Sequence, residues 1–211
     1  FDVLAKIDRE AGTKRGREVL GITDDLPIVF YPGQIWHAGK ALSEVVKALN
    51  EVGLPCHLVA SKHGRMGEAP EEDGFWREAE KKFQWDFHPV TDFRYIREIV
   101  LASRVVVGMY SSLQNEAAAL GVQVISVLYP DQGAAQFALD TGGVMKEFPL
   151  VTLGCSEKAN NYIKLLFLLK IVVLNRLRNK DPLALRTRQS LVFRLAGHKA
   201  ERTAGAVLSL L

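Results

Sequence analysis

The segment 104–130 constrains the fold of this chain more than any other part of the sequence. Two runs of β-branched residues, 105–107 and 122–127, flank a segment rich in helix-forming residues, 114–120. Two serines precede the helical part, as is typical of a helix start, and Gly121 follows it, as is typical of a helix end. The pattern therefore predicts a strand–helix–strand unit.

The turn that connects the first of these strands to the helix is a candidate anion-binding site. The first N–H groups of a helix lack partners within the helix and lie at the positive end of its dipole. Ser111 and Ser112 add two hydroxyl groups there. Gln114 lies in the same first turn, and Glu116 follows about one turn later. We expect these residues to hold phosphate groups and a neighbouring ribose diol, with plain helix capping and a solvent-facing glutamate as the alternatives.

The same residues carry a family resemblance. The segment resembles the nucleotide-sugar half of glycosyltransferases of the GT-B fold and of the related UDP-N-acetylglucosamine 2-epimerases. The resemblance implies that Ser111 and Ser112 contact the diphosphate of a bound nucleotide sugar and that Glu116 holds its ribose. The epimerases usually have two glycines after the first serine, where this chain has Ser112 and Leu113. The resemblance therefore favours a transferase over an epimerase.

Strand patterns and helix patterns alternate along most of the chain. This alternation predicts a three-layer α/β/α domain with a mostly parallel, Rossmann-like sheet of about six strands. A short apolar run around residues 151–153 follows the last clear strand, and the rest of the chain is predicted to be helical. The order resembles one half of the GT-B fold, and the segment 197–211 resembles the final helix of that family. The five clearest strand patterns are 27–32, 55–60, 87–90, 104–107 and 122–127.

Three parts of the chain are distinguished by this reading. Residues 1–25 are predicted to be connector helices, residues 26–155 the nucleotide-sugar-binding domain, and residues 156–211 helices that pack on the same domain. A GT-B enzyme carries its acceptor site, and usually its catalytic base, on an N-terminal domain. The resemblance thus implies an excised C-terminal domain or a subunit with a separate partner half. Catalytic residues stay unknown at this point, and turnover by this chain alone is expected to be poor.

The loop after the first predicted strand is the second candidate contact with the donor. Gly33 and Gln34 occupy the position from which, by resemblance, a loop approaches the donor phosphates. His37 could donate a hydrogen bond to a phosphate or a sugar hydroxyl. A simple turn and an ordinary surface histidine are the alternatives.

Two further places follow from the resemblance. Val90 ends the third predicted strand, where the family reads the base with backbone groups, so Val90 is expected to border the base. Asp131 and Gln132 follow the strand run before Pro130, where many GT-B proteins hold hydroxyls of the donor sugar. A carboxylate and an amide are suitable partners for hydroxyl groups. An ordinary turn is the alternative here as well.

Several classes of function find no support in the sequence. The two cysteines, Cys56 and Cys155, are far apart and are expected to be reduced thiols, and no metal-type spacing occurs. Motifs typical of hydrolases, kinases and dehydrogenases are missing from the sequence. We therefore expect no metal and no cofactor. The resemblance implies a nucleoside-diphosphate sugar as donor substrate, with UDP as the expected nucleotide. The alternatives are a sugar-nucleotide epimerase domain and a non-catalytic interaction domain of the same fold.

The C-terminal quarter of the chain is basic. Residues 156–211 hold eleven Lys or Arg residues against three Asp or Glu residues, a net charge of +8. Its apolar run, 162–174, is interrupted by Lys164 and Lys170 and is shorter than the about 20 apolar residues of a membrane-spanning helix. We expect a cytoplasmic protein with no nucleic-acid partner. Peripheral contact with the inner face of a membrane and simple covering of the sheet are the alternatives for this segment.

Overall fold

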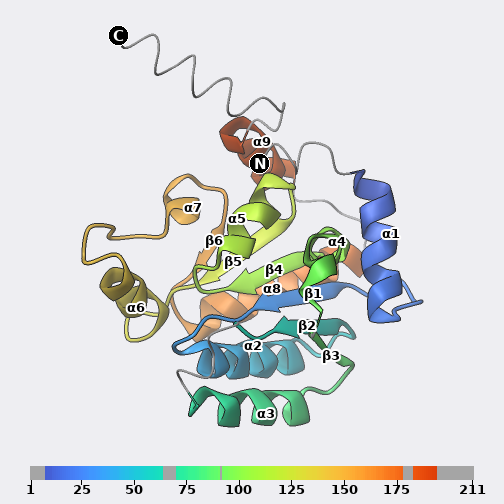
Figure 1. Cartoon of the computed structure of the whole chain (residues 1–211), viewed down its shortest axis with the longest axis horizontal. Helices are drawn as coiled ribbons and strands as arrows, with labels where there is room; N and C mark the ends of the chain where they lie inside the picture. Colours follow the sequence, from blue (N-terminus) through green and yellow to red (C-terminus); the bar gives the residue numbers. More distant parts are fainter. Residues whose placement is uncertain (1–7, 64–69, 91, 178–182, 194–211) are drawn as a thin grey trace.

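The computed structural model describes residues 8–63, 70–90, 92–177 and 183–193. Six strands form one sheet in the order β3-β2-β1-β4-β5-β6, and every neighbouring pair is parallel (Figure 1). The predicted Rossmann-like fold with a parallel sheet is thereby confirmed. The strands are β1 (Ile28–Pro32), β2 (His57–Ser61), β3 (Phe87–Val90), β4 (Val105–Gly108), β5 (Gln123–Val127) and β6 (Glu157–Ala159).

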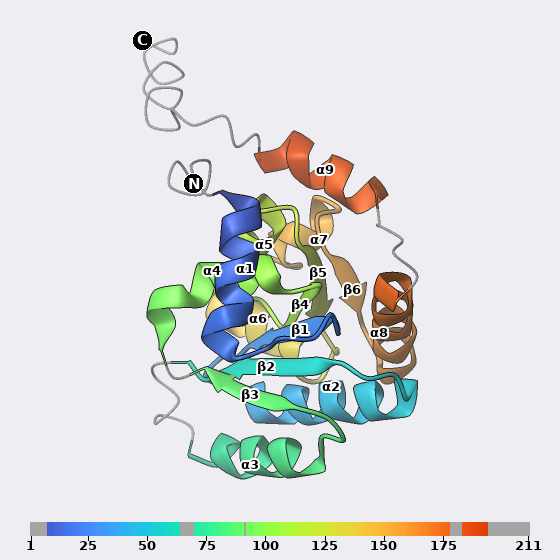
Figure 2. The same cartoon turned by 90° about the vertical axis from the view of Figure 1, so that its right-hand side faces the viewer.

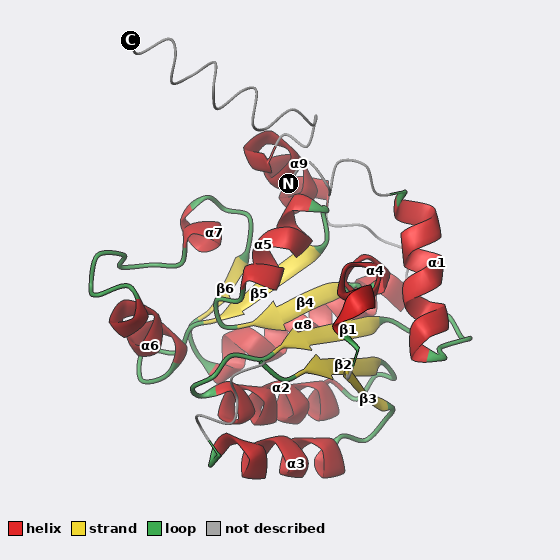
Figure 3. Cartoon of the chain, viewed as in Figure 1, coloured by secondary structure: helices red, strands yellow, loops and turns green. Residues whose placement is uncertain are grey.

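Helices cover both faces of the sheet, which makes the three layers (Figures 2 and 3). One face carries α2 (Ala38–Val52) and α8 (Tyr162–Leu177), and α3 (Glu72–Lys82) packs against α2. The other face carries α4, α5 and smaller elements, with α1 packed along α4. The elements of this second side are α1 (Arg9–Leu20), the 3₁₀ turn η3 (Phe93–Tyr95), α4 (Ile96–Ala102), α5 (Ser112–Ala119), α6 (Gly133–Asp140), α7 (Pro149–Thr152) and α9 (Leu183–Phe193).

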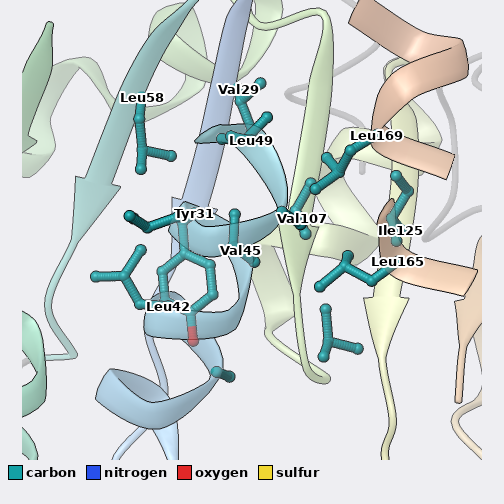
Figure 4. Packing of buried hydrophobic residues seen from close by; sticks show 14 of the residues in the cluster. Val29, Tyr31, Leu42, Val45, Leu49, Leu58, Val107, Ile125, Leu165 and Leu169 are labelled. Atoms are coloured by element: carbon teal, nitrogen blue, oxygen red, sulfur yellow. The ribbon is translucent and has the colours of Figure 1, made fainter. Parts of the chain in front are cut away.

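Alternation along β1 divides the core into two clusters. Val29 and Tyr31 face α2 and α8, whereas Ile28 and Phe30 face the side of α4 and α5. All five residues of β1 are buried, as expected for a central strand of a parallel sheet. Figure 4 shows the first cluster, in which the Tyr31 ring lies beside α2. The Tyr31 hydroxyl donates to the carbonyl oxygen of Ala38 at 2.6 Å and so fixes the start of α2.

The end of the sheet differs from the prediction. The run around residues 151–153 lies in and just after α7, not in a strand, because Pro149 at the first turn favours a helix start. The sixth strand, β6, lies at 157–159, inside a segment predicted to be helical throughout. Its backbone pairs with β5, but only Ala159 of its three residues is buried. The strand therefore carries almost no apolar pattern.

α1 lies within the segment predicted to be connector helices, and it approaches α4 closely because Gly16 has no side chain. A Cβ atom on Gly16 would lie 2.2 Å from the carbonyl oxygen of Glu98. The segment 197–211, whose resemblance to a final helix is noted above, lies outside the described residues.

Both cysteines are buried and unbridged, as the sequence predicts. Burial raises the pKa of the Cys56 thiol to about 12. It also raises the pKa of the Cys155 thiol, although Arg188 acts in the opposite direction. Both thiols therefore remain protonated near neutral pH, and they behave as small apolar groups of the core.

Candidate functional site

The candidate site lies where β1 and β4 meet in the sheet. These strands are neighbours in space, but the chain leaves β1 towards α2 on one face and leaves β4 towards α5 on the other. Open α/β sheets bind ligands at the carboxyl ends of the strands at such a reversal of direction. Gly108 allows the close approach, because a Cβ atom there would lie 3.3 Å from the Pro32 carbonyl oxygen. The loops after β1 and β4 therefore begin side by side.

The start of α5 is a complete capping box. The Ser111 hydroxyl oxygen accepts from the Leu113 N–H at 3.3 Å, and the Ser111 N–H donates to Gln114 Oε1 at 2.8 Å. This reciprocal arrangement satisfies two N–H groups of the helix start. Ser111 is buried, whereas Ser112, the first helical residue, is exposed. Of the two serines, Ser112 therefore presents its hydroxyl to solvent at the positive end of the helix.

Gln114 is enclosed below this turn. Its side chain is fully buried, and Nε2 lies 3.3 Å from the carbonyl oxygens of both Gly108 and Ile125 and 3.2 Å from Ser126 Oγ. The Ser126 and Ser156 hydroxyls lie 2.8 Å apart and extend the network towards β6. Gln114 thus holds the β4–α5 turn on the sheet through both ends of its amide. The serines of this network were not identified from the sequence, because their contacts depend on strand pairing.

Glu116 lies on the second turn of α5 and is half-buried. Its Oε2 accepts from Arg97 Nε of α4 at 3.1 Å. An ion pair this accessible contributes little to stability. The carboxylate retains acceptor capacity on its other lone pairs, as the binding of a ribose diol requires.

The loop after β1 is held to β2 by a backbone hydrogen bond. The Gly33 N–H donates to the carbonyl oxygen of Ser61 at 2.8 Å, and a Cβ atom on Gly33 would clash with that oxygen. His37 precedes α2 with a positive φ of 56°, and Gln34 is half-buried. Gly33 is therefore a packing glycine at the end of β1, and the side chains of Gln34 and His37 are the polar groups of this loop.

A carboxylate from α3 occupies the start of α2. Glu72 is 5 % exposed and accepts from the N–H groups of His37 at 2.9 Å and of Gly39 at 2.7 Å. The helix start that the sequence places near the donor is thus neutralised by the chain itself. The sequence gives little sign of Glu72, which lies within a polar segment predicted to be a loop.

The loop after β5 packs against the β4–α5 turn. A Cβ atom on Gly133 would lie 2.5 Å from the Val127 carbonyl oxygen and 3.3 Å from Met109 Sδ. Asp131 is exposed and Gln132 is buried just before α6. These two residues therefore lie beside the turn that carries Ser111 and Ser112.

A hydrogen bond joins the same turn to α6. The Tyr110 hydroxyl donates to Asp140 Oδ2 at 2.8 Å, and burial, together with this bond, raises the pKa of Tyr110. Val90 does not belong to this group. It ends the edge strand β3, from which β2 and β1 separate β4, and its side chain is half-buried. The structure thus gathers the loops after β1, β4 and β5 and leaves Val90 at the sheet edge.

A second polar cluster lies at the opposite, amino-terminal edge of the sheet. His57 of β2 and His88 of β3 meet with 3.1 Å between Nδ1 and Nε2, and Asp24 lies 2.9 Å from His57 Nε2. The hydrogen bond to His57 lowers the pKa of Asp24, and burial, followed by the neighbouring His57, lowers the pKa of His88. Sequence spacing did not indicate this cluster, since 31 residues separate the two histidines.

Comparison with known proteins defines the class of fold. No family model and no curated protein sequence matches this chain. Solved structures do match. The architecture that they share with this chain is one half of the GT-B fold. The likeness covers nearly the whole chain, at sequence identities of 11–15 % in the three examples below.

The particular structures are a polymerase, a glycosyltransferase and an epimerase. The match to the wall teichoic acid polymerase TagF covers 99 % of this chain and 49 % of the TagF chain, with 14 % sequence identity and a TM-score of 0.59. The match to a glycosyltransferase from Rickettsia africae covers 91 % of this chain and 50 % of that protein's chain, with 15 % sequence identity and a TM-score of 0.55. The match to the UDP-GlcNAc 2-epimerase from Neisseria meningitidis, solved with UDP-GlcNAc, covers 86 % of this chain and 47 % of the epimerase chain. The sequence identity is 11 % and the TM-score is 0.54. This chain spans about half the length of each.

Proposed function

We propose that this chain is the donor-binding half of a glycosyltransferase that uses a nucleoside-diphosphate sugar. The observation that carries the proposal is the start of α5, where an exposed Ser112 lies at the reversal point of the sheet. Two of the similar structures are named as a polymerase of teichoic acid and as a glycosyltransferase. A third protein of this architecture was solved with a nucleotide sugar.

In this proposal the diphosphate binds at the start of α5. Backbone N–H groups and the Ser111 and Ser112 hydroxyls stabilise the negative charge that grows on the diphosphate as it leaves the anomeric carbon. Glu72 already neutralises the start of α2. The phosphates therefore gather at α5, while Gln34 and His37 reach them with side chains from the other side.

The remaining donor contacts follow from the same placement. Glu116 holds the ribose hydroxyls, and Asp131 and Gln132 hold hydroxyls of the sugar. Val90 lies apart from these loops at the sheet edge, and its place beside the base, with UDP as the expected nucleotide, is proposed from the family resemblance. An acceptor hydroxyl, deprotonated by a base on the partner half, attacks the anomeric carbon as the bond to the diphosphate breaks. The chain alone therefore binds the donor but transfers it slowly.

Calorimetric titration of the chain with UDP, GDP, ADP and CDP tests this function. We expect one nucleotide to bind, and Ser112→Ala to weaken it roughly tenfold through loss of a charge-assisted hydrogen bond. Ser112 is preferable to Ser111 for this test, because it is exposed and removing its hydroxyl leaves the cap in place. Ser190→Ala on α9, also exposed, is the matched control. Absence of heat with all four nucleotides at millimolar concentration would remove the proposal.

The epimerase function is the second candidate, because the epimerase from Neisseria meningitidis shares the architecture. An epimerase needs acid and base groups beside the sugar. His37 and Asp131 are titratable side chains of the loops that gather at this site. Release of free UDP from UDP-GlcNAc by the full-length protein would favour the epimerase.

We also propose a cytoplasmic enzyme whose α8 contacts an anionic membrane surface. In the described part of the chain, no helix has the length and apolar content needed to cross a bilayer. Leu165, Leu169 and other residues of α8 cover the sheet, whereas Ile163 and Phe167 are 70 % and 54 % exposed. Lys164 lies with its Nζ 5.5 Å from the Phe167 ring centroid. Apolar and basic groups side by side suit an interfacial helix.

Co-sedimentation with vesicles checks the membrane contact. The chain is expected to bind anionic vesicles at low salt and to release them at high salt, since each basic residue near the surface contributes about 1 kcal/mol. Phe167→Ser should reduce the bound fraction severalfold. Phe75→Ser on α3, 40 % exposed, is the matched control. Equal recovery with neutral and anionic vesicles would contradict this part of the proposal.

A further inference from the structure

The polar cluster at the amino-terminal edge of the sheet has the composition of a metal site. His57, Asp86 and His88 each offer one possible ligand atom, and these atoms all lie within 4.8 Å of one another. His57 Nδ1 lies 3.1 Å from His88 Nε2 and 3.5 Å from Asp86 Oδ2. Imidazole nitrogens with a carboxylate oxygen form a typical ligand set for zinc and related ions.

Strand pairing explains why these side chains meet. Leu58 pairs with Phe87, and Val59 pairs with His88. Side chains alternate between faces, so His57 and His88 lie on the same face of the sheet as diagonal neighbours. Asp86 directly precedes Phe87 and so lies across from His57. The contact is therefore a consequence of the register of β2 and β3.

A fourth residue fixes the orientation of His57. Asp24, in the loop between α1 and β1, accepts from His57 Nε2 at 2.9 Å. It also accepts from the Leu26 N–H at 2.9 Å and lies 3.6 Å from Arg17, so it is itself held in place. With the proton of His57 on Nε2, the lone pair of Nδ1 points towards His88. A carboxylate that orients a histidine in this way is the usual support of a metal-binding imidazole.

We propose that His57 Nδ1, His88 Nε2 and the Asp86 carboxylate bind a divalent transition-metal ion of the zinc type, with Asp24 as the residue that positions His57. Bonds of 2.0–2.1 Å to a tetrahedral ion place its ligand atoms about 3.3 Å apart. The two separations from His57 Nδ1, 3.1 Å and 3.5 Å, lie on either side of that value, and the third ligand pair lies within 4.8 Å. Three protein ligands leave a fourth position for water. Asp86, whose side chain is 72 % exposed, gives the ion access from solvent.

The ion would act away from the proposed donor site. The cluster joins the loop before β1 to the amino ends of β2 and β3, whereas the donor loops lie at the carboxyl ends. Metal binding is therefore expected to stabilise this edge of the sheet and the loop that carries Asp24. It takes no part in sugar transfer in this proposal, so failure of the nucleotide titrations would leave it standing.

Titration of the full chain, first stripped with EDTA, tests the site. We expect Zn²⁺ to raise the melting temperature in a concentration-dependent manner, and Mg²⁺ to have no effect, because Mg²⁺ requires octahedral oxygen ligands. His88→Ala and His57→Gln should weaken Zn²⁺ binding at least tenfold, and Asp24→Asn should weaken it by roughly 10–100-fold. His37→Asn is the matched control. It removes a histidine from the opposite edge of the sheet, and asparagine tolerates the positive φ at this position.

The visible spectrum of the Co²⁺-loaded chain is the second readout. Intense bands typical of four ligands are expected for the unmodified chain and should be lost in His88→Ala. Because His88 is only half-buried, this variant is expected to fold even if His57→Gln does not. If His88→Ala binds Zn²⁺ as tightly as the unmodified chain, or if Co²⁺ gives the weak spectrum of a hydrated ion, the proposal is overturned. The cluster is then a hydrogen-bonded chain from His88 through His57 to Asp24.

Discussion

Replacement of Glu72 by alanine is expected to lower the free energy of unfolding by about 3 to 5 kcal/mol, since each hydrogen bond to a charged group is worth about 1.5–3 kcal/mol. The buried carboxylate accepts two short hydrogen bonds, from His37 and Gly39, at the start of α2. Its removal leaves these two N–H donors without an acceptor. It also leaves the positive end of the α2 dipole without a compensating negative charge. Urea unfolding followed by circular dichroism measures the loss.

Two comparisons sharpen this test. Glu71→Ala removes the neighbouring, exposed glutamate and should change the free energy of unfolding by no more than about 0.5 kcal/mol. Glu72→Gln should give an intermediate loss, because an amide can accept one of the hydrogen bonds but opposes the other donor. Sulfate should stabilise Glu72→Ala more than the unmodified chain, by taking the place of the carboxylate at the helix start. Equal effects of Glu71→Ala and Glu72→Ala would contradict the assigned role.

Replacement of Gln114 by methionine is the second large effect, with an expected loss of about 3 kcal/mol, the cost of leaving two or more buried polar groups unpaired. Methionine has nearly the same length and shape, so packing is kept while the amide is removed. The Ser111 N–H loses its acceptor, and Ser126 Oγ loses a donor. Thermal and urea unfolding of the variant measure this difference.

Gln136→Met on α6 is the matched control for this substitution. Its Nε2 donates to Asp140 Oδ1 at 2.8 Å on the accessible side of the helix, so its loss should cost less than about 0.5 kcal/mol. If the two methionine variants unfold at the same urea concentration, Gln114 does not hold the turn. A direct role of Gln114 in nucleotide binding would instead appear as lost affinity without lost stability.

Most of the fold could be predicted because its signals are local. The β-branched runs of β1, β4 and β5 and the apolar spacing of α2 are visible in short windows of sequence, and Gly121 marks the end of α5. β6 could not be predicted, since it has three residues, of which one is buried, and it joins the sheet by pairing with the backbone of β5. The prediction from the run around Val151 was wrong because so short an apolar run does not distinguish a strand from a helical turn.

The candidate site was predictable only where its chemistry is local. Ser111 and Ser112 could be identified because a helix cap is encoded by adjacent residues. Glu72 reaches the start of α2 from α3, and His57 meets His88 through the register of two strands. Such contacts depend on how distant segments pack, so a single sequence contains no direct sign of them.

The two outer strands limit how this sheet can be joined to another polypeptide. β3 carries Pro89, which has no N–H to offer to a further strand, and β6 is only three residues long, with the charged side chains of Glu157 and Lys158. Lys158 is further held by Glu147 at 2.6 Å. Continuation of the ladder across a subunit boundary is thus disfavoured at both margins. Another polypeptide would therefore have to attach to this sheet through loops and helix surfaces.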